Sequence, residues 1–243
     1  MLYTTHDREE KEATYVSMMA RGMVDGLLLV IPRNGDVCLD GLRKQGFPHV
    51  IIDGPEGCGK SPSLLAENFQ GAYDATAYLI SEGHRKIGFI SGTLDIFSAK
   101  DRLSGYLAAL REHNIPVHPG YIQKGDFFRM TGYDAAKRLI GLESSPTAIF
   151  ASNDVMAFGV MQAARELELT IPTDLSIVGF DDVPQTRATY PKLTTVRQPL
   201  EEMGQMAAEM LSNLIDDKKI DVSDVRFKAK LVIRQSSGPP KEV

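Results

Sequence analysis

The alternation of short apolar runs with longer segments of helical period limits the folds that this chain can adopt. Five runs are apolar along nearly their whole length and end in polar or glycine-containing passages: residues 27–31, 49–53, 87–91, 147–151 and 176–180. Continuous hydrophobicity is typical of parallel strands that are buried on both faces. The sequence therefore predicts an α/β fold, with doubly wound parallel sheets covered by helices on both sides.

The segments between these runs carry the signals of helices and of helix ends. Helices are expected from Ser98, over 131–142, over 155–166 and over 200–215, and recognisable helix also begins near Asn68. Gly22, Gly46 and Gly83 stand just past helical segments, where a left-handed C-terminal cap favours glycine. A last strand is expected over 228–235, followed by a frayed tail.

The composition excludes several classes of protein. With 243 residues, 43% of them apolar, the chain can bury one large core or two modest ones. A net charge of -5 argues against unaided binding of DNA or RNA. Two cysteines without metal-ligand spacing predict no zinc site, no cofactor and a reducing cytoplasm. No signal peptide and no membrane-spanning run is expected.

Five motifs, taken in order, resemble the lactose/galactose repressor (LacI/GalR) family of transcriptional regulators. They cover residues 83–90, 102–106, 148–157, 171–182 and 193–196, the last joined by Gln198 and Pro199. The resemblance holds along almost the whole chain, and it implies a periplasmic-binding-protein-like effector domain. Such a domain has two α/β subdomains joined by three crossings, with a small molecule held in the cleft between them.

The resemblance also implies boundaries and a missing part. One subdomain is expected to comprise residues 1–67 and 198–222, the other 68–197 and 223–243, with crossings near Asn68, Arg197 and Ser223. The match begins only at the family's second strand, here residues 2–5. We therefore expect the chain to lack the helix-turn-helix headpiece and the first strand and helix of the N-terminal subdomain, so operator DNA would be bound only by a full-length form.

Polar residues that directly follow apolar strands are candidates for ligand contacts, because open parallel sheets bind ligands beyond the carboxyl ends of their strands. Asp53, Asn153 and Asp181 stand at such places. A carboxylate or carboxamide can hold two adjacent sugar hydroxyls. The residues alone leave helix capping by Asn153 and turn formation by Asp181 as equal alternatives. The resemblance implies effector contacts at Asn153 and Asp181. For Asp53, a ligand contact and a structural role remain equal alternatives.

Three further candidates come from the resemblance. Arg102 stands where family members carry an arginine that turns into the cleft, the alternative being a solvated surface arginine. Ser98 is a weaker candidate, since serine is equally good as a helix N-cap. The family often places an aromatic ring at Phe127 to stack on the ligand. Phe127 and its neighbour Phe128 are equal candidates for facing the cleft.

A rival motif runs from Gly54 to Ser61, where Gly-Pro-Glu-Gly-Cys-Gly-Lys-Ser satisfies the phosphate-loop pattern directly after a strand. A phosphate loop requires a helix that opens at its lysine and serine. Here Pro62 follows at once and the next residues predict a short extended run. We therefore expect a variable loop, with a nucleotide-binding protein as the remote alternative.

The expected function is sensing of a small-molecule effector by a transcriptional repressor, with a periplasmic sugar-binding protein of a transporter as the alternative. The effector is a sugar, a sugar phosphate or a purine, and no catalytic set is present, so no enzyme is expected. The partner is a second copy of the chain. Phe158, Met161 and residues 185–190 are the candidate dimer contacts, and core packing is the alternative role of Phe158 and Met161.

Overall fold

A computed structural model describes residues 2, 9–32, 35–54, 61–218 and 224–241. The chain forms two compact units and passes between them three times. Unit 1 comprises Met1–Ala66 and Pro199–Phe227, and unit 2 comprises Glu67–Gln198 and Lys228–Val243. The third passage comes after Phe227 rather than near Ser223, because residues 224–227 pair with the sheet of unit 1.

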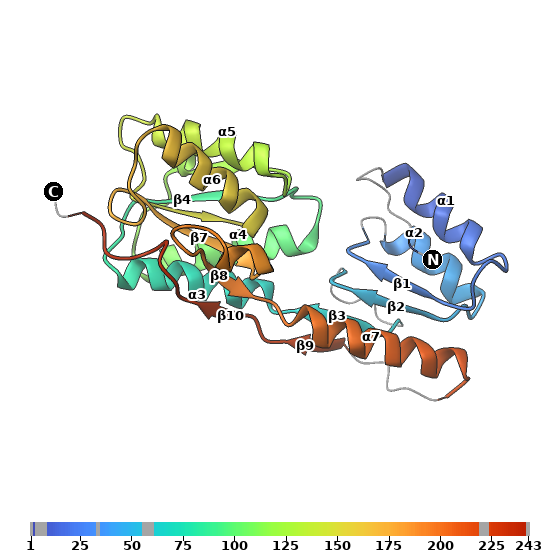
Figure 1. Cartoon of the computed structure of the whole chain (residues 1–243). Helices are drawn as coiled ribbons and strands as arrows, with labels where there is room; N and C mark the ends of the chain where they lie inside the picture. Colours follow the sequence, from blue (N-terminus) through green and yellow to red (C-terminus); the bar gives the residue numbers. More distant parts are fainter. Residues whose placement is uncertain (1, 3–8, 33–34, 55–60, 219–223, 242–243) are drawn as a thin grey trace. The chain divides into compact units, whose positions relative to one another are not determined.

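Unit 1 is a parallel sheet with helices on both faces (Figure 1). Its sheet has the order β1-β2-β3-β9. The elements are α1 (Glu9–Met19), β1 (Leu27–Val30), α2 (Gly35–Lys44), β2 (His49–Ile52), β3 (Ser63–Ala66), α7 (Leu200–Ile215) and β9 (Asp224–Phe227). Leu27 packs with Val16 of α1 and Leu42 of α2. On the other side, Met203 of α7 packs against Val50.

Unit 2 has a six-stranded sheet with the order β10-β8-β7-β6-β4-β5, parallel except for the antiparallel β10. Its helices are α3 (Asn68–Ser81), α4 (Phe97–Glu112), α5 (Arg129–Ile140) and α6 (Asp154–Glu166), with short 3-10 turns η1 (Pro119–Tyr121) and η2 (Pro184–Arg187). Its strands are β4 (Ile87–Ser91), β5 (Ile122–Lys124), β6 (Ala148–Ala151), β7 (Ser176–Asp181), β8 (Thr194–Arg197) and β10 (Lys230–Val232). The doubly wound α/β architecture predicted from the apolar runs is confirmed.

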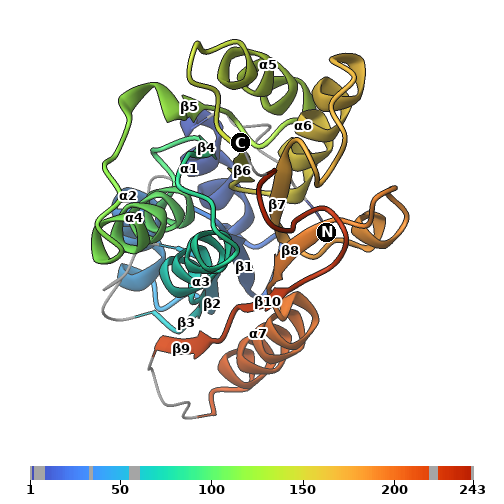
Figure 2. The ribbon, with the colours of Figure 1, turned by 90° about the vertical axis from the view of Figure 1, so that its left-hand side faces the viewer.

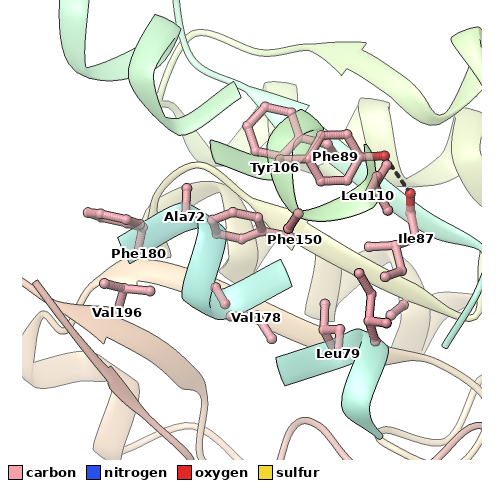
Figure 3. Packing of buried hydrophobic residues seen from close by; sticks show 14 of the residues in the cluster. Ala72, Leu79, Ile87, Phe89, Tyr106, Leu110, Phe150, Val178, Phe180 and Val196 are labelled. Carbon is pink, nitrogen blue, oxygen red and sulfur yellow. Dashed lines mark hydrogen bonds between the residues drawn. The ribbon is translucent and has the colours of Figure 1, made fainter. Parts of the chain in front are cut away.

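The strands of unit 2 are buried because helices cover both faces of the sheet. Figure 2 shows α3 and α4 on one side of the strands and α5 and α6 on the other. On the α3/α4 side the Phe89 ring stacks on Tyr106, with ring centroids 4.9 Å apart. The Tyr106 hydroxyl donates to the carbonyl of Ile87 at 2.8 Å, so α4 is fixed in register along β4 (Figure 3).

Two local predictions have opposite outcomes. Gly22, Gly46 and Gly83 all adopt positive φ after helices, as predicted for left-handed caps. The tail was expected to fray, and this is wrong as far as residue 241. Ser236 exchanges backbone hydrogen bonds with Ile177 and Lys192, and Gly238 accepts a bond from buried His84.

The expected dimer contacts on α6 are corrected in part. Met161 is only 6% exposed and belongs to the core that α5 and α6 form with the sheet. It has almost no surface to offer a partner, so the alternative of core packing holds for Met161. Phe158 is partly buried against the same core. Among residues 185–190, Tyr190 is 89% exposed.

Candidate functional site

The carboxyl edge of the unit 2 sheet gathers most of the polar residues predicted from the sequence. Strands β4, β6 and β7 are neighbours, and they end at Ser91, Ala151 and Asp181. Asn153 follows β6 as the cap of α6, while Arg102 reaches this edge from the second turn of α4. Because parallel strands all end at the same edge, residues far apart in the chain meet here.

Arg102 is a buried residue, only 4% exposed, and not the surface arginine that the sequence left as an alternative. Its Nε donates to Oδ1 of Asn68 at 2.9 Å, and one terminal nitrogen donates to the carbonyl of Ser152 at 2.5 Å. The guanidinium also lies 3.9 Å from the centre of the Phe180 ring. A planar fork with donors in fixed directions suits this combination of stacking and hydrogen bonding.

Asp181 lies within ion-pair distance of Arg102, with 3.5 Å between the carboxylate and the guanidinium nitrogen. The same carboxylate oxygen accepts a hydrogen bond of 2.7 Å from the Gln198 side chain. Its side chain keeps 20% of its surface exposed, so it is not sealed off from solvent. The backbone at Asp181 has φ of 117°, a region that non-glycine residues rarely adopt and that often occurs at functional sites.

Asn153 caps α6, as the capping alternative predicted. Its Oδ1 accepts from the amide of Met156 at 2.9 Å, and its Nδ2 donates to the carbonyl of Phe127 at 3.1 Å. Both ends of the carboxamide are therefore held in place. Each still has hydrogen-bonding capacity left, so capping does not exclude a contact to a ligand.

Phe127 and Phe128 separate clearly in the structure. Phe127 is partly buried against the core, and its ring lies so close over Gly92 that a Cβ there would collide with it. Phe128 is 59% exposed, so it is not a core residue. Phe127 has φ of 71°, a second non-glycine residue with a left-handed backbone at this edge.

Ser98 does not cap α4. The cap residue is Ile96, and Ser98 is the second residue inside the helix, 4% exposed. Its hydroxyl makes no hydrogen bond within the described ranges.

Asp53 belongs to unit 1. It follows β2 with φ of 55°, and its Oδ1 accepts from the amide of Ala66 at 3.3 Å.

The sequence alone did not single out several residues that complete this edge: Asn68, Ser152 and Gln198, which hold Arg102 and Asp181. Asn68 is predictable as a helix start and Gln198 as part of a motif. Nothing in the neighbouring sequence predicts that Asn68 bonds Arg102, 34 residues away, or that Gln198 bonds Asp181, 17 residues away.

Asp154 lies beneath the edge and is fully buried. Its pKa is raised to about 7, first by burial and also by the nearby carboxylates of Asp181 and Asp182. Hydrogen bonds from the Thr195 hydroxyl (2.6 Å) and the Val183 amide (2.9 Å) lower it only in part. Through these bonds to Val183 and Thr195, Asp154 joins α6 to the end of β7 and to β8.

Comparisons with known proteins place this geometry in a family. Residues 76–237 match the family model of the periplasmic binding protein-like domain. The chain is 39% identical to an HTH-type transcriptional repressor, PurR, of Proteus mirabilis, over 98% of this chain and 71% of that protein. The chain belongs to the LacI family of transcriptional regulators. It corresponds to the effector-sensing domain of such a repressor.

Solved structures of LacI-family members share the fold. A regulatory protein of Chloroflexus aggregans is similar with a TM-score of 0.84 and 34% identity, over 97% of this chain and 84% of that chain. A regulator of Enterococcus faecium, solved with bound ribose, has a TM-score of 0.84 and 28% identity, over 93% of this chain and 84% of that one. The transport-protein alternative has no comparable support.

The phosphate-loop reading is contradicted where the structure describes the motif. Residues 55–60 lie outside the described ranges. Ser61 is buried, and its hydroxyl is bonded to His49 (2.7 Å) and Arg43 (3.0 Å). Strand β3 begins at Ser63, where a phosphate loop would continue as a helix.

In the ranges that the structure describes, no group of three or more His, Cys, Asp or Glu side chains could hold a metal ion. Within the same ranges, no helix is long and apolar enough to cross a membrane.

Proposed function

We propose that this LacI-family domain binds a small hydroxyl-bearing effector at the carboxyl edge of the unit 2 sheet. The observation that supports this most is the buried Arg102 paired with the partly exposed Asp181 at the edge where three neighbouring strands end. Because burying charges costs desolvation energy, a largely buried charge pair at such an edge is a candidate functional site. Asn153, Ser98 and Phe127 are proposed as further contacts.

The chemistry of the edge favours a sugar-like effector. The Asp181 carboxylate offers paired acceptors and the Asn153 carboxamide an acceptor and a donor, either of which can bond adjacent hydroxyls, and Phe127 can pack on the apolar face of a sugar ring. The ribose held by the Enterococcus faecium regulator supports the same class of ligand. A planar base would use the aromatic ring equally well, and purines therefore belong in the first ligand screen.

Asp53 of unit 1 is proposed as a ligand contact. Like Asp181, it follows a parallel strand and has a positive φ. Effector binding would regulate DNA binding by favouring one conformational state of the protein, because a ligand shifts only an equilibrium whose states it binds unequally. DNA contact itself is assigned to a helix-turn-helix headpiece outside these residues.

The remaining proposals follow from family membership. We propose a homodimer that acts in the cytoplasm and binds its effector without converting it. Sedimentation of the purified chain should give twice the monomer mass of 26.7 kDa. Incubation with the effector should return it unchanged, and steady product formation would overturn the non-enzymatic assignment.

A thermal-shift screen over sugars, sugar phosphates and purine bases tests the proposed function. A ligand at about 100 times its Kd adds about 2.7 kcal/mol to stability, which is a measurable rise in Tm. Asp181→Asn should abolish the rise, while Asp134→Asn, a matched change on the exposed side of α5, should leave it intact. An undiminished response in Asp181→Asn would remove this edge as the effector site.

A further inference from the structure

The amino end of α4 carries free hydrogen-bonding capacity beside the proposed site. This helix has 16 residues, and its cap residue Ile96 has no side-chain oxygen to accept from the first amides. No acidic residue stands in the first turn. The first intrahelical backbone bond runs from the amide of Lys100 to the carbonyl of Ile96, so earlier amides have no partner inside the helix. Such an end attracts negative charge.

A buried hydroxyl is a second, independent observation that points to a ligand at this place. Ser91, the last residue of β4, is 0% exposed, and its Oγ has no hydrogen-bond partner in the described part of the chain. Leaving a buried hydroxyl unpaired is costly, so a partner from outside the chain is expected.

The alternation of side chains along β4 aims Ser91 at the start of α4. Ile87 and Phe89 contact Tyr106 on the α4 side of the sheet (Figure 3). Ser91 is the next residue on that side, because every second residue of a strand points to the same face. One step of two residues along the strand matches about one turn of the antiparallel helix, which places Ser91 beneath the turn of Arg102, with Ser98 one turn nearer the helix start.

We propose that Ser91, Ser98 and the first amides of α4 bind an anionic oxygen group of the effector, a phosphate or a carboxylate. This inference rests on the proposed function and narrows its ligand class. Ser98 lies one turn before Arg102, and its hydroxyl makes no hydrogen bond in the described ranges. Because Asp181 already balances the charge of Arg102, the helix amides and the two hydroxyls supply most of the anion contact.

Calorimetric titrations of the whole chain with inorganic phosphate, D-ribose 5-phosphate and D-ribose, at matched ionic strength, test this inference. Phosphate should bind, and ribose 5-phosphate should bind more tightly than ribose. Ser91→Ala and Ser98→Ala should each weaken binding of both anions about tenfold, the weight of one hydrogen bond to a charged group. Ser81→Ala, on the exposed end of α3, should have no effect.

The outcomes separate the two proposals. If ribose binds through Asp181 but phosphate does not bind and the serine variants change nothing, the anion site is overturned and the effector site stands. If D-gluconate, a carboxylate, shares the serine dependence and phosphate does not, the group is a carboxylate. Ser91→Ala replaces an unpaired buried hydroxyl with an apolar group, so its Tm without ligand should not fall. A large fall would show a structural role and overturn the assignment of Ser91.

Discussion

The Arg102 guanidinium connects three segments that are distant in the chain. It contacts Asn68 at the start of α3, the carbonyl of Ser152 after β6 and the carboxylate of Asp181. Each partner depends on the others, because removal of one would leave a buried charge or acceptor unsatisfied. The side chains at this edge of the sheet are therefore held in place before any effector binds.

Arg102→Lys tests this organisation. Lysine keeps the positive charge but lacks the planar guanidinium group, whose nitrogens bond Asn68 and Ser152 at the same time. We expect a loss of about 1–3 kcal/mol in the free energy of unfolding, the cost of an unpaired buried group, and a loss of effector binding. Urea denaturation measures the first effect. The control Arg165→Lys, on the exposed end of α6, should change neither, and full stability of Arg102→Lys would contradict the account.

Asp154 makes the stability of unit 2 depend on pH. Its pKa is about 7 in the folded chain, against an ordinary value of 3.8 for an aspartic acid side chain. The folded state therefore holds a proton that the unfolded state releases, and the free energy of unfolding falls as the pH rises between these values. Above about pH 7 the loss is complete.

Asp154→Asn should remove this dependence. The amide oxygen can accept from the Val183 amide while its NH2 group donates to the Thr195 hydroxyl, so both contacts survive. The variant should gain stability over the wild type at about pH 8 and much less at about pH 5. Thermal unfolding at both pH values measures the difference. A variant that is equally destabilised at both would show that Asp154 is needed as a carboxylate.

The sequence predicts part of this site and misses the rest for physical reasons. Asn153 and Asp181 were found because strand ends are recognisable from apolar runs. The burial of Arg102 was implied by the family and not by its neighbours in sequence. Ser98 looked like a cap, but the cap residue of α4 is the apolar Ile96, two residues earlier. The partners Asn68 and Gln198 require tertiary contacts that no local pattern encodes.

At the scale of elements, glycines set the distance between paired helices. Gly105 lets α4 approach α3, since a Cβ there would overlap the carbonyl oxygen of Phe69. Gly159 does the same between α6 and α5, where it faces the carbonyl of Arg129. These two helix pairs cover the two faces of the unit 2 sheet, so their spacing also positions Arg102 and Asn153.

Gly105→Ala should destabilise the chain by about 1–3 kcal/mol, the usual cost of overpacking. Gly204→Ala in α7 is the matched control, because a Cβ at Gly204 meets nothing within 4 Å. Alanine favours helix over glycine by up to about 1 kcal/mol, so the control should be neutral or stabilising. Equal effects of the two substitutions on the urea midpoint would contradict the close helix contact.

The element pattern itself was mostly predictable. The five apolar runs correspond to β1, β2, β4, β6 and β7, within one residue at either end. Strands β5, β8 and β9 were not predicted, because runs of three or four residues are too short to stand out, and the strand expected over 228–235 is confined to Lys230–Val232. Strand β5 forms by pairing with β4, and β9 by pairing with β3, each at the edge of its sheet.

At the scale of the whole molecule, the C-terminal tail returns to unit 2 and completes it. The Ser236 hydroxyl donates to the carbonyl of Ile177 at 2.6 Å, and the Gly238 carbonyl accepts from Ser176 and His84, both at 2.9 Å. These contacts satisfy polar groups at the amino end of β7. No local pattern predicted them, since Gly-Pro-Pro is typical of a loose terminus.

Deletion of residues 236–243 should therefore cost more than loss of a frayed end. Buried groups of β7 would be left unpaired, each at about 1–3 kcal/mol, so the urea midpoint should fall clearly. Lys241→Ala, which removes only the exposed pair with Asp174, should cost at most about 1 kcal/mol. A deletion variant as stable as the full chain would show that the tail is dispensable.

The central claim is that the effector binds at the carboxyl edge of the unit 2 sheet. Hydrogen–deuterium exchange of the whole chain, with and without the effector found in the screen, tests it most directly. We predict slower exchange at the ends of β4, β6 and β7 and in the first turns of α4 and α6, with no such change in Asp181→Asn. Protection confined to residues 54–66, or absent from these strand ends, would contradict the account.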